Sequence, residues 1–183
     1  ADPSAVIACD QYDSSLRQNR GDGIVVQGND GGWIGGLSPV LGNVINAGTA
    51  LRCSSVSNAY AYNNAIGFNP YSSIPFFARM DYGIVLTGCH RMTFGQFNAT
   101  NTVSCADSAA VWAQDCTGIV FSAMRVGLWD YYVGGTNDGD GVVLSNCISC
   151  SISDSIIAGS RIGLFLVDTT NTSVYGSTIK ELI

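Results

Sequence analysis

The residues best suited to chemistry lie in one long stretch, Val126 to Asp140. It contains three aspartates, and glycosidases commonly need two carboxyl groups, about 5–5.5 Å apart for retention or about 6.5–9.5 Å apart for inversion. A long loop on a rigid scaffold is also where function is usually found. We therefore name three catalytic candidates: Asp138, Asp140 and Asp130.

Aromatic and amide side chains accompany these aspartates. Flat ring faces suit sugar rings, and an amide can both donate to hydroxyl groups and accept from them. We predict that four residues of the stretch bind ligand: Trp129, Tyr131, Tyr132 and Asn137. The alternative to a binding site is an ordinary loop that leads back into the next strand.

Two smaller patterns could also carry chemistry. His90 and Arg91 could supply a base and a neutralising charge to a polysaccharide lyase, although a lone exposed pair usually has no such role. Asp115, Asn146 and Asp168 each precede a Cys or Thr at the same repeat position, and a ladder of such oxygens could bind calcium. We favour the interpretation that they are turn residues.

The seven cysteines favour packing over metal binding. Cys147 and Cys150 have metal-ligand spacing, but there is no second such pair and only one histidine, which makes a poor zinc site. Small apolar side chains at a repeated position can instead stack inside a core. We predict free thiols, no metal and no cofactor.

A repeat explains how these residues are positioned. Each copy begins with a small residue, continues with three mostly apolar residues and two polar or turn residues, and ends with Cys or Thr. The copies span residues 83–89, 110–116, 141–147 and 163–169, and residues 23–29 fit the same template. A constant core with unequal spacing is typical of a solenoid.

Strand alternation sorts the repeat residues into columns. The columns expected inside are Ile84, Val111, Val142, Leu164; Leu86, Ala113, Leu144, Leu166; Cys89, Cys116, Cys147, Thr169; and Phe94, Phe121, Ile152, Val174. Stacked side chains on both sides of a bend predict an all-β parallel β-helix. We expect one domain over residues 1–183, with irregular coils and insertions in 1–82 and regular coils in 83–183. Because the C-terminal end has no polar cap, we expect either a fragment of a longer chain or contact with another domain or subunit.

A further column should face outward: Val85, Trp112, Val143 and Phe165. An exposed strand normally carries polar residues on its outer face, so an apolar column indicates a partner surface. We predict that this column forms a subunit interface. The alternative is that a loop of the same chain covers this column.

Composition excludes several classes of protein. The net charge of −6 argues against a nucleic-acid surface, which needs clustered Lys and Arg. No apolar run approaches the roughly 20 residues that a membrane helix needs, so we expect no membrane insertion. The acidic, weakly charged composition suits an extracellular or virion protein.

The repeats between Gly83 and Gly176, together with residues 23–29, resemble the pectate-lyase-like right-handed β-helix of bacteriophage tailspikes. This resemblance implies a homotrimer on a virion, in contact with other virion proteins, that binds and often cleaves bacterial surface polysaccharide. It rests on repeat and composition, so it assigns no catalytic residue. Residues 137–140 also faintly resemble the Asn-Thr-Asp element of polygalacturonase-like hydrolases, but their Gly-His-Gly and Arg-Ile-Lys elements are absent.

Three functions remain as hypotheses at this point. The first is a spike or tail-fibre domain that recognises, and could degrade, bacterial polysaccharide. The second is a secreted polysaccharide hydrolase or lyase, with hydrolysis favoured over elimination. The third is a structural decoration or head-fibre protein of a virion.

Overall fold

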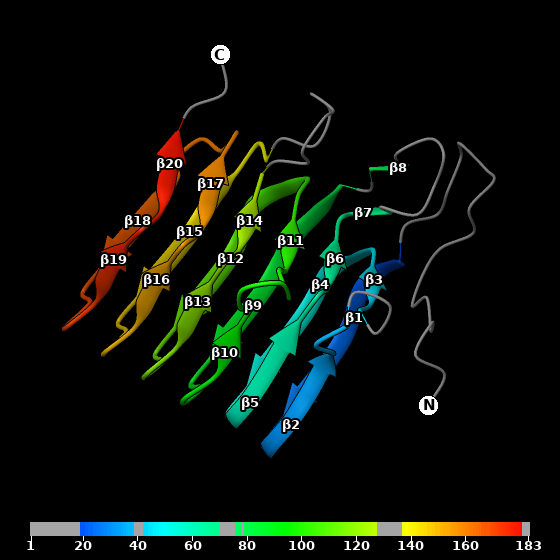
Figure 1. Ribbon diagram of the computed structural model, residues 1–183. Helices are drawn as coiled ribbons and strands as arrows, with labels where there is room; N and C mark the ends of the chain where they lie inside the picture. Colours follow the sequence, from blue (N-terminus) through cyan, green and yellow to red (C-terminus); the bar gives the residue numbers. More distant parts are fainter. Residues whose placement is uncertain (1–18, 39–41, 70–75, 78, 128–136, 181–183) are drawn as a thin grey trace.

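The computed structural model describes residues 19–38, 42–69, 76–77, 79–127 and 137–180. These residues form an all-β chain with three parallel sheets of six strands each (Figure 1). Successive strands enter the three sheets in rotation, so each turn of the chain adds one strand to every sheet. The result is a β-helix-like solenoid.

Each sheet collects one strand from every coil. The first sheet consists of β1 (Asn19–Gln27), β4 (Ala47–Ser54), β9 (Met80–Thr87), β12 (Ala106–Gln114), β15 (Asp140–Ser145) and β18 (Leu164–Val167). The second consists of β2 (Asp30–Gly35), β5 (Ser57–Tyr62), β10 (Thr93–Phe94), β13 (Val120–Ser122), β16 (Ser151–Ser153) and β19 (Ser173–Tyr175). The third consists of β3 (Val44–Ile45), β6 (Ala65–Ile66), β11 (Thr102–Val103), β14 (Arg125–Val126), β17 (Ile156–Ala158) and β20 (Thr178–Lys180).

The register between coils confirms the predicted columns. In the first sheet Ile84 pairs with Val111, which pairs with Val142, and Val142 pairs in turn with Leu164. In the second sheet Phe94 pairs with Phe121, and their rings stack with centroids 5.4 Å apart. The interior columns are almost completely buried through the middle coils, because each side chain is covered by its equivalents above and below.

The first half of the chain follows the same plan. β1 pairs with β4, and β4 pairs with β9, so the early strands continue the first sheet without interruption. Residues 29–32 form no hairpin, because β2 pairs in parallel with β5. The antiparallel pair found among the described residues, β7 (Phe68–Asn69) with β8 (Phe76–Phe77), belongs to an excursion between β6 and β9.

The corners of the coils depend on residues with positive φ. Asp115, Asn146 and Asp168 have φ of 56°, 49° and 50°, and Gly88 at the same position has 60°. Asn, Asp and Gly tolerate this left-handed conformation best. The backbone therefore supports the interpretation of these residues as turn residues.

A ladder of buried amides runs along the bend before the third sheet. Asn43 Nδ2 donates to Asn64 Oδ1 at 2.9 Å, and Asn64 Nδ2 donates to Asn101 Oδ1 at 2.9 Å. In the later coils the hydroxyl groups of Ser155 and Ser177 take over, each accepting from a backbone N–H of the coil before it. Polar groups buried at the bend are thus satisfied between coils.

The last described coil exposes its interior columns. Leu166 is 40% exposed, Val174 41% and Ile179 46%, whereas their equivalents one coil earlier are at most 1% exposed. Among the described residues there is no helix long and apolar enough to cross a membrane.

Candidate functional site

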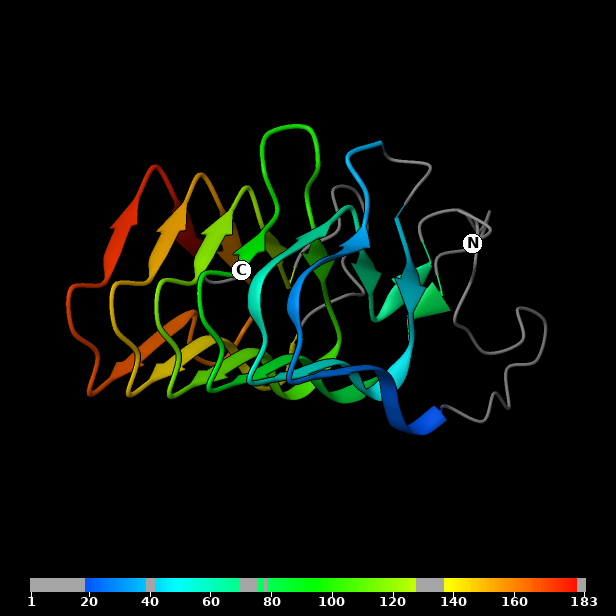
Figure 2. The ribbon, with the colours of Figure 1, turned by 90° about the horizontal axis from the view of Figure 1, so that it is seen from below.

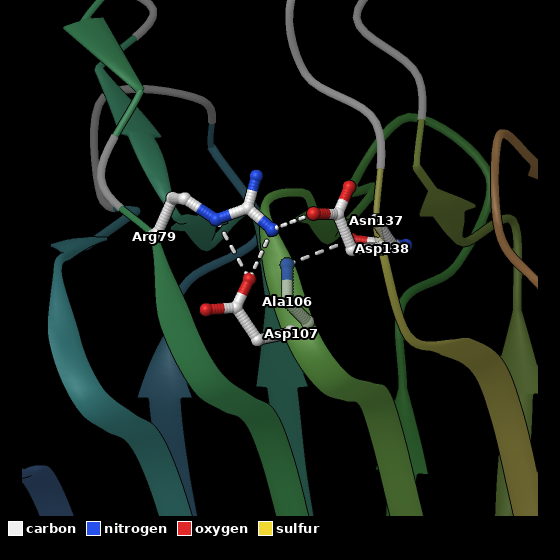
Figure 3. A network of polar contacts seen from close by, with 5 residues as sticks. All are labelled: Arg79, Ala106, Asp107, Asn137 and Asp138. Atoms are coloured by element: carbon white, nitrogen blue, oxygen red, sulfur yellow. Dashed lines mark hydrogen bonds and ion pairs between the residues drawn. The ribbon is translucent and has the colours of Figure 1, made fainter.

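Two excursions leave the solenoid at the same corner, between the third sheet and the first. One connects β6 to β9 and the other connects β14 to β15. The coil between them turns directly from β11 into β12 through Ser104 and Cys105. The first excursion returns to β9 and the second to β15, the two strands that flank β12 in the first sheet. Polar residues from the ends of both excursions come together there with Asp107 of β12 (Figure 3).

Arg79 is the centre of this cluster. Its Nε donates to Asp107 Oδ1 at 2.7 Å, and its Nη2 donates to the carboxylates of both Asp107 and Asp138. Figure 3 shows the guanidinium group lying between the two carboxylates. The hydrogen bond that Arg79 donates to Asp107 raises the pKa of Arg79, and Asp138 adds to this effect, so the arginine stays charged.

The three charged side chains remain accessible to solvent. Arg79 is 48% exposed, Asp107 45% and Asp138 65%. Each pairing therefore stabilises the fold only slightly, by about 0.2–1 kcal/mol. Their unused donor and acceptor positions can still reach a ligand.

Asn137 has a different role from Asp138. Its Oδ1 accepts a hydrogen bond from the backbone N–H of Ala106 at 3.0 Å, and its Nδ2 donates to Ser160 Oγ at 3.1 Å. Only 4% of the residue is exposed. Asn137 therefore joins the coils before and after it, and it positions Asp138 rather than facing solvent itself.

Asp140 pairs with the following coil. Arg161 donates to it through Nε at 3.1 Å and through Nη2 at 3.2 Å. The Asp140 side chain is 11% exposed, and its carboxylate raises the pKa of Arg161 by hydrogen bonding. Asp138 thus binds an arginine two coils earlier and Asp140 binds one on the next coil, so each carboxylate has its own partner.

The other predicted site residues lie outside the described residues. They are Asp130, Trp129, Tyr131 and Tyr132. The predicted site is therefore described at its C-terminal end alone, by Asn137, Asp138 and Asp140.

Sequence reasoning did not find Arg79, Asp107 and Arg161. A signal for the first two was present: Asp107 and Asp138 each stand three residues before the small residue that begins a repeat, and Arg79 stands four residues before Gly83. Counting residues backward from the start of each repeat would have placed these three charged residues at nearly the same repeat position. Arg161 had no such signal, because its position depends on the length of the turn after β17.

No family model, no curated protein and no solved structure matches this chain. Its site must therefore be interpreted from its own geometry. Within the described part of the chain, no cluster of three or more His, Cys, Asp or Glu side chains could hold a metal ion.

The predicted outward column is partly buried within the single chain. Its members do stack in register, but Val85 is 7% exposed and Val143 2%, so both are buried within a single chain. Trp112 lies between these two valines, and Phe165 lies beyond Val143, so larger rings alternate with smaller side chains along the column. Phe165 itself is 44% exposed. The two valines agree with the alternative of cover by the same chain, and the interface as a whole stays a prediction.

The six described cysteines are free and buried. Cys89, Cys116 and Cys147 stack in the predicted column, and the backbone N–H of Cys89 donates to Cys116 Sγ at 3.4 Å. Burial raises the pKa of Cys53 to about 12 and that of Cys105 to about 11. These two thiols therefore stay protonated and unreactive at neutral pH.

Proposed function

We propose that this chain is a glycan-binding domain of a virion spike or tail fibre. In this proposal it is a right-handed parallel β-helix that assembles as a homotrimer and recognises bacterial surface polysaccharide. The observation that carries the proposal is the position of Arg79, Asp107 and Asp138 where two excursions meet on a rigid solenoid. Charged donors and acceptors fixed in this way suit the hydroxyl groups of a sugar.

Binding is favoured over hydrolysis by the ion pairs that the aspartates form. A glycosidase acid must carry a proton, and two carboxyl groups must flank one glycosidic bond. Asp138 and Asp140 are each held by a guanidinium group, and these groups belong to opposite coils. Each carboxylate is therefore engaged by its own arginine, an arrangement that suits ligand binding better than joint action on one glycosidic bond.

The virion location and the trimer rest on composition and shape. The chain is acidic and stacks its coils into a rod-like solenoid (Figure 2). Exposed apolar side chains such as Phe165 could contact other subunits along such a rod.

Binding of bacterial polysaccharides to the purified chain tests the proposal. A panel of capsular and lipopolysaccharide glycans is titrated while free reducing ends are measured in the same samples. We expect binding to at least one glycan without release of reducing ends. Binding should weaken in Arg79→Ala and should be unchanged in Arg52→Ala, a control that removes a similar exposed ion pair with Asp22 on the first coils.

Other results would select other functions. A concentration of reducing ends that increases with time would favour a polysaccharide hydrolase. Failure to bind any glycan would contradict the proposal and favour a structural virion protein. Light scattering tests the trimer independently, and a monomer at micromolar concentration would contradict it.

A further inference from the structure

A group of aromatic rings lies on the outer face of the second sheet, in its first two coils. Trp33 in β2 and Tyr60 in β5 are opposite each other in register. Their rings stack with centroids 4.9 Å apart and an interplanar angle of 26°. Trp33 is 59% exposed and Tyr60 39%, even though large aromatic side chains are usually buried.

Tyr62 holds the two rings in place. It is only 5% exposed, and its ring meets Trp33 edge-on at 5.5 Å and lies 5.9 Å from Tyr60. The coils can approach closely here because Gly35 has no side chain: a Cβ atom would lie 2.0 Å from the carbonyl oxygen of Tyr62. The platform formed by Trp33, Tyr60 and Tyr62 is therefore rigid before any ligand binds.

Two loops flank this platform. One follows β2 and the other follows β10, and Figure 2 shows the β10 loop (green) and the β2 loop (blue) standing above the neighbouring coils. Asn63 ties both loops to the coil between them. Its backbone N–H donates to the Ala99 carbonyl at 3.4 Å, and its Nδ2 donates to the Gly36 carbonyl at 2.6 Å. The β10 loop also carries Phe97, which is 85% exposed.

The chain segments that build the platform and its two loops are polar but almost uncharged. The three segments that build it, residues 28–42, 54–70 and 92–104, contain a single charged residue, Asp30. Asn58 Nδ2 donates to Asp30 Oδ1 at 2.6 Å, and Asn58 stands two residues before Tyr60 on the same face of β5. Stacking sites for single-stranded nucleic acids combine such rings with cationic grooves, which these segments lack. Flat rings beside amide and carboxylate groups instead suit a neutral sugar.

We propose that Trp33, Tyr60 and Tyr62 form a second carbohydrate-binding surface, separate from the Arg79 cluster, that stacks a neutral pyranose ring. Asp30 and Asn58 would bind the hydroxyl groups at the edge of that ring. The choice of ligand rests in part on the proposed glycan function. The location of the surface does not rest on that function, because it follows from the exposed ring stack and the almost uncharged segments that build it.

Calorimetric titration with neutral hexasaccharides of glucose, galactose and N-acetylglucosamine tests this surface. We expect Trp33→Ala to weaken binding by about tenfold and Trp33→Phe to recover most of the loss, since it keeps an aromatic face. Tyr175→Ala is the matched control. Tyr175 stands on the outer face of the same sheet and is 58% exposed, but it is four coils away from the platform.

The results separate this surface from the Arg79 cluster. Loss of binding in Trp33→Ala, with binding kept in Arg79→Ala, supports the platform even if the first proposal fails. Loss in Arg79→Ala alone leaves the first proposal standing and overturns this one. The platform is also overturned if no hexasaccharide binds, if Tyr175→Ala weakens binding as much as Trp33→Ala, or if a single-stranded oligonucleotide displaces the sugar. Self-association that Trp33→Ala abolishes would likewise assign the rings to a subunit contact.

Discussion

Asn101 Oδ1 accepts two hydrogen bonds from Asn64, one from its backbone N–H and one from its side-chain Nδ2, both 2.9 Å long. Asn101 Nδ2 then donates to the carbonyl of Ala61 at 2.6 Å. Both asparagines are at most 2% exposed. One buried amide therefore joins two coils at a bend where the strand ladder is interrupted.

Asn101→Ala should strongly destabilise the protein. The change leaves the buried backbone N–H of Asn64 without its partner, and such a group costs about 1–3 kcal/mol. It also removes one of two hydrogen bonds to the Ala61 carbonyl, which still accepts from the Gly95 backbone N–H. We expect the free energy of unfolding to fall by about 2–4 kcal/mol in denaturant titrations. Asn43→Ala, at the partly buried end of the same ladder, should cost only about 1 kcal/mol. Equal losses of unfolding free energy in the two variants would contradict the view that burial makes the Asn101 hydrogen bonds more stabilising.

Arg79→Ala should remain folded. Its ion pairs with Asp107 and Asp138 are about half exposed, and such pairs contribute little to stability. We expect the free energy of unfolding to fall by about 1 kcal/mol or less. A larger loss would mean that the cluster is structural, and it would weaken the interpretation of this corner as a binding site.

The Asp22–Arg52 ion pair should make stability depend on pH in the acid range. The hydrogen bond from Arg52 lowers the pKa of Asp22 below its ordinary value of 3.8. A carboxyl group with a lowered folded-state pKa stabilises the fold above its unfolded pKa, and this contribution disappears as pH falls through the folded value.

The difference in unfolding free energy between the parent and Arg52→Ala tests this pair. We expect a constant difference from pH 7 to about pH 5 and a smaller one below about pH 4. Because both side chains are about one-third exposed, the difference should not exceed about 1 kcal/mol. When Arg52→Ala is instead compared with the parent residue in an Asp22→Asn background, the difference should show no such narrowing, since no carboxyl group at residue 22 titrates. A difference in unfolding free energy that grows as the pH falls would contradict this role of the Asp22–Arg52 ion pair.

Thiol reagents should react slowly with the native protein. The six described cysteines are all buried, and the seventh, Cys9, lies outside the described residues. We expect at most one thiol to react at pH 8 in the native state and all seven to react in denaturant. Cys9→Ser should abolish the native reaction. Rapid reaction of two or more thiols would show that the cysteine column opens readily.

The predicted and observed folds agree best in residues 83–176. There, strand alternation and a repeated Cys or Thr predicted the interior columns, because every coil presents the same side chain at the same position. Residues 31–82 lacked such a signal. The register of Trp33 with Tyr60 depends on coil length, and a loop and the excursion with β7 and β8 obscure that length in the sequence.

The candidate site was predicted only in part. The aspartates were visible as an acidic cluster, but their partners were not, since Arg79 lies two coils earlier and Arg161 one coil later. Asn137 was predicted to bind ligand because of its residue type. Its buried hydrogen bonds to Ala106 and Ser160 instead give it a structural role.

The sequence by itself determined the repeat, the dry interior and the turn residues at the corners. These features are local: they depend on alternation within a strand and on the backbone preferences of Asn, Asp and Gly. Only the tertiary structure decided which residues meet across coils, such as Arg79 with Asp138 and Trp33 with Tyr60. Coils of unequal length lie between these partners, and the stacking of the sheets, rather than distance along the chain, brings their side chains together.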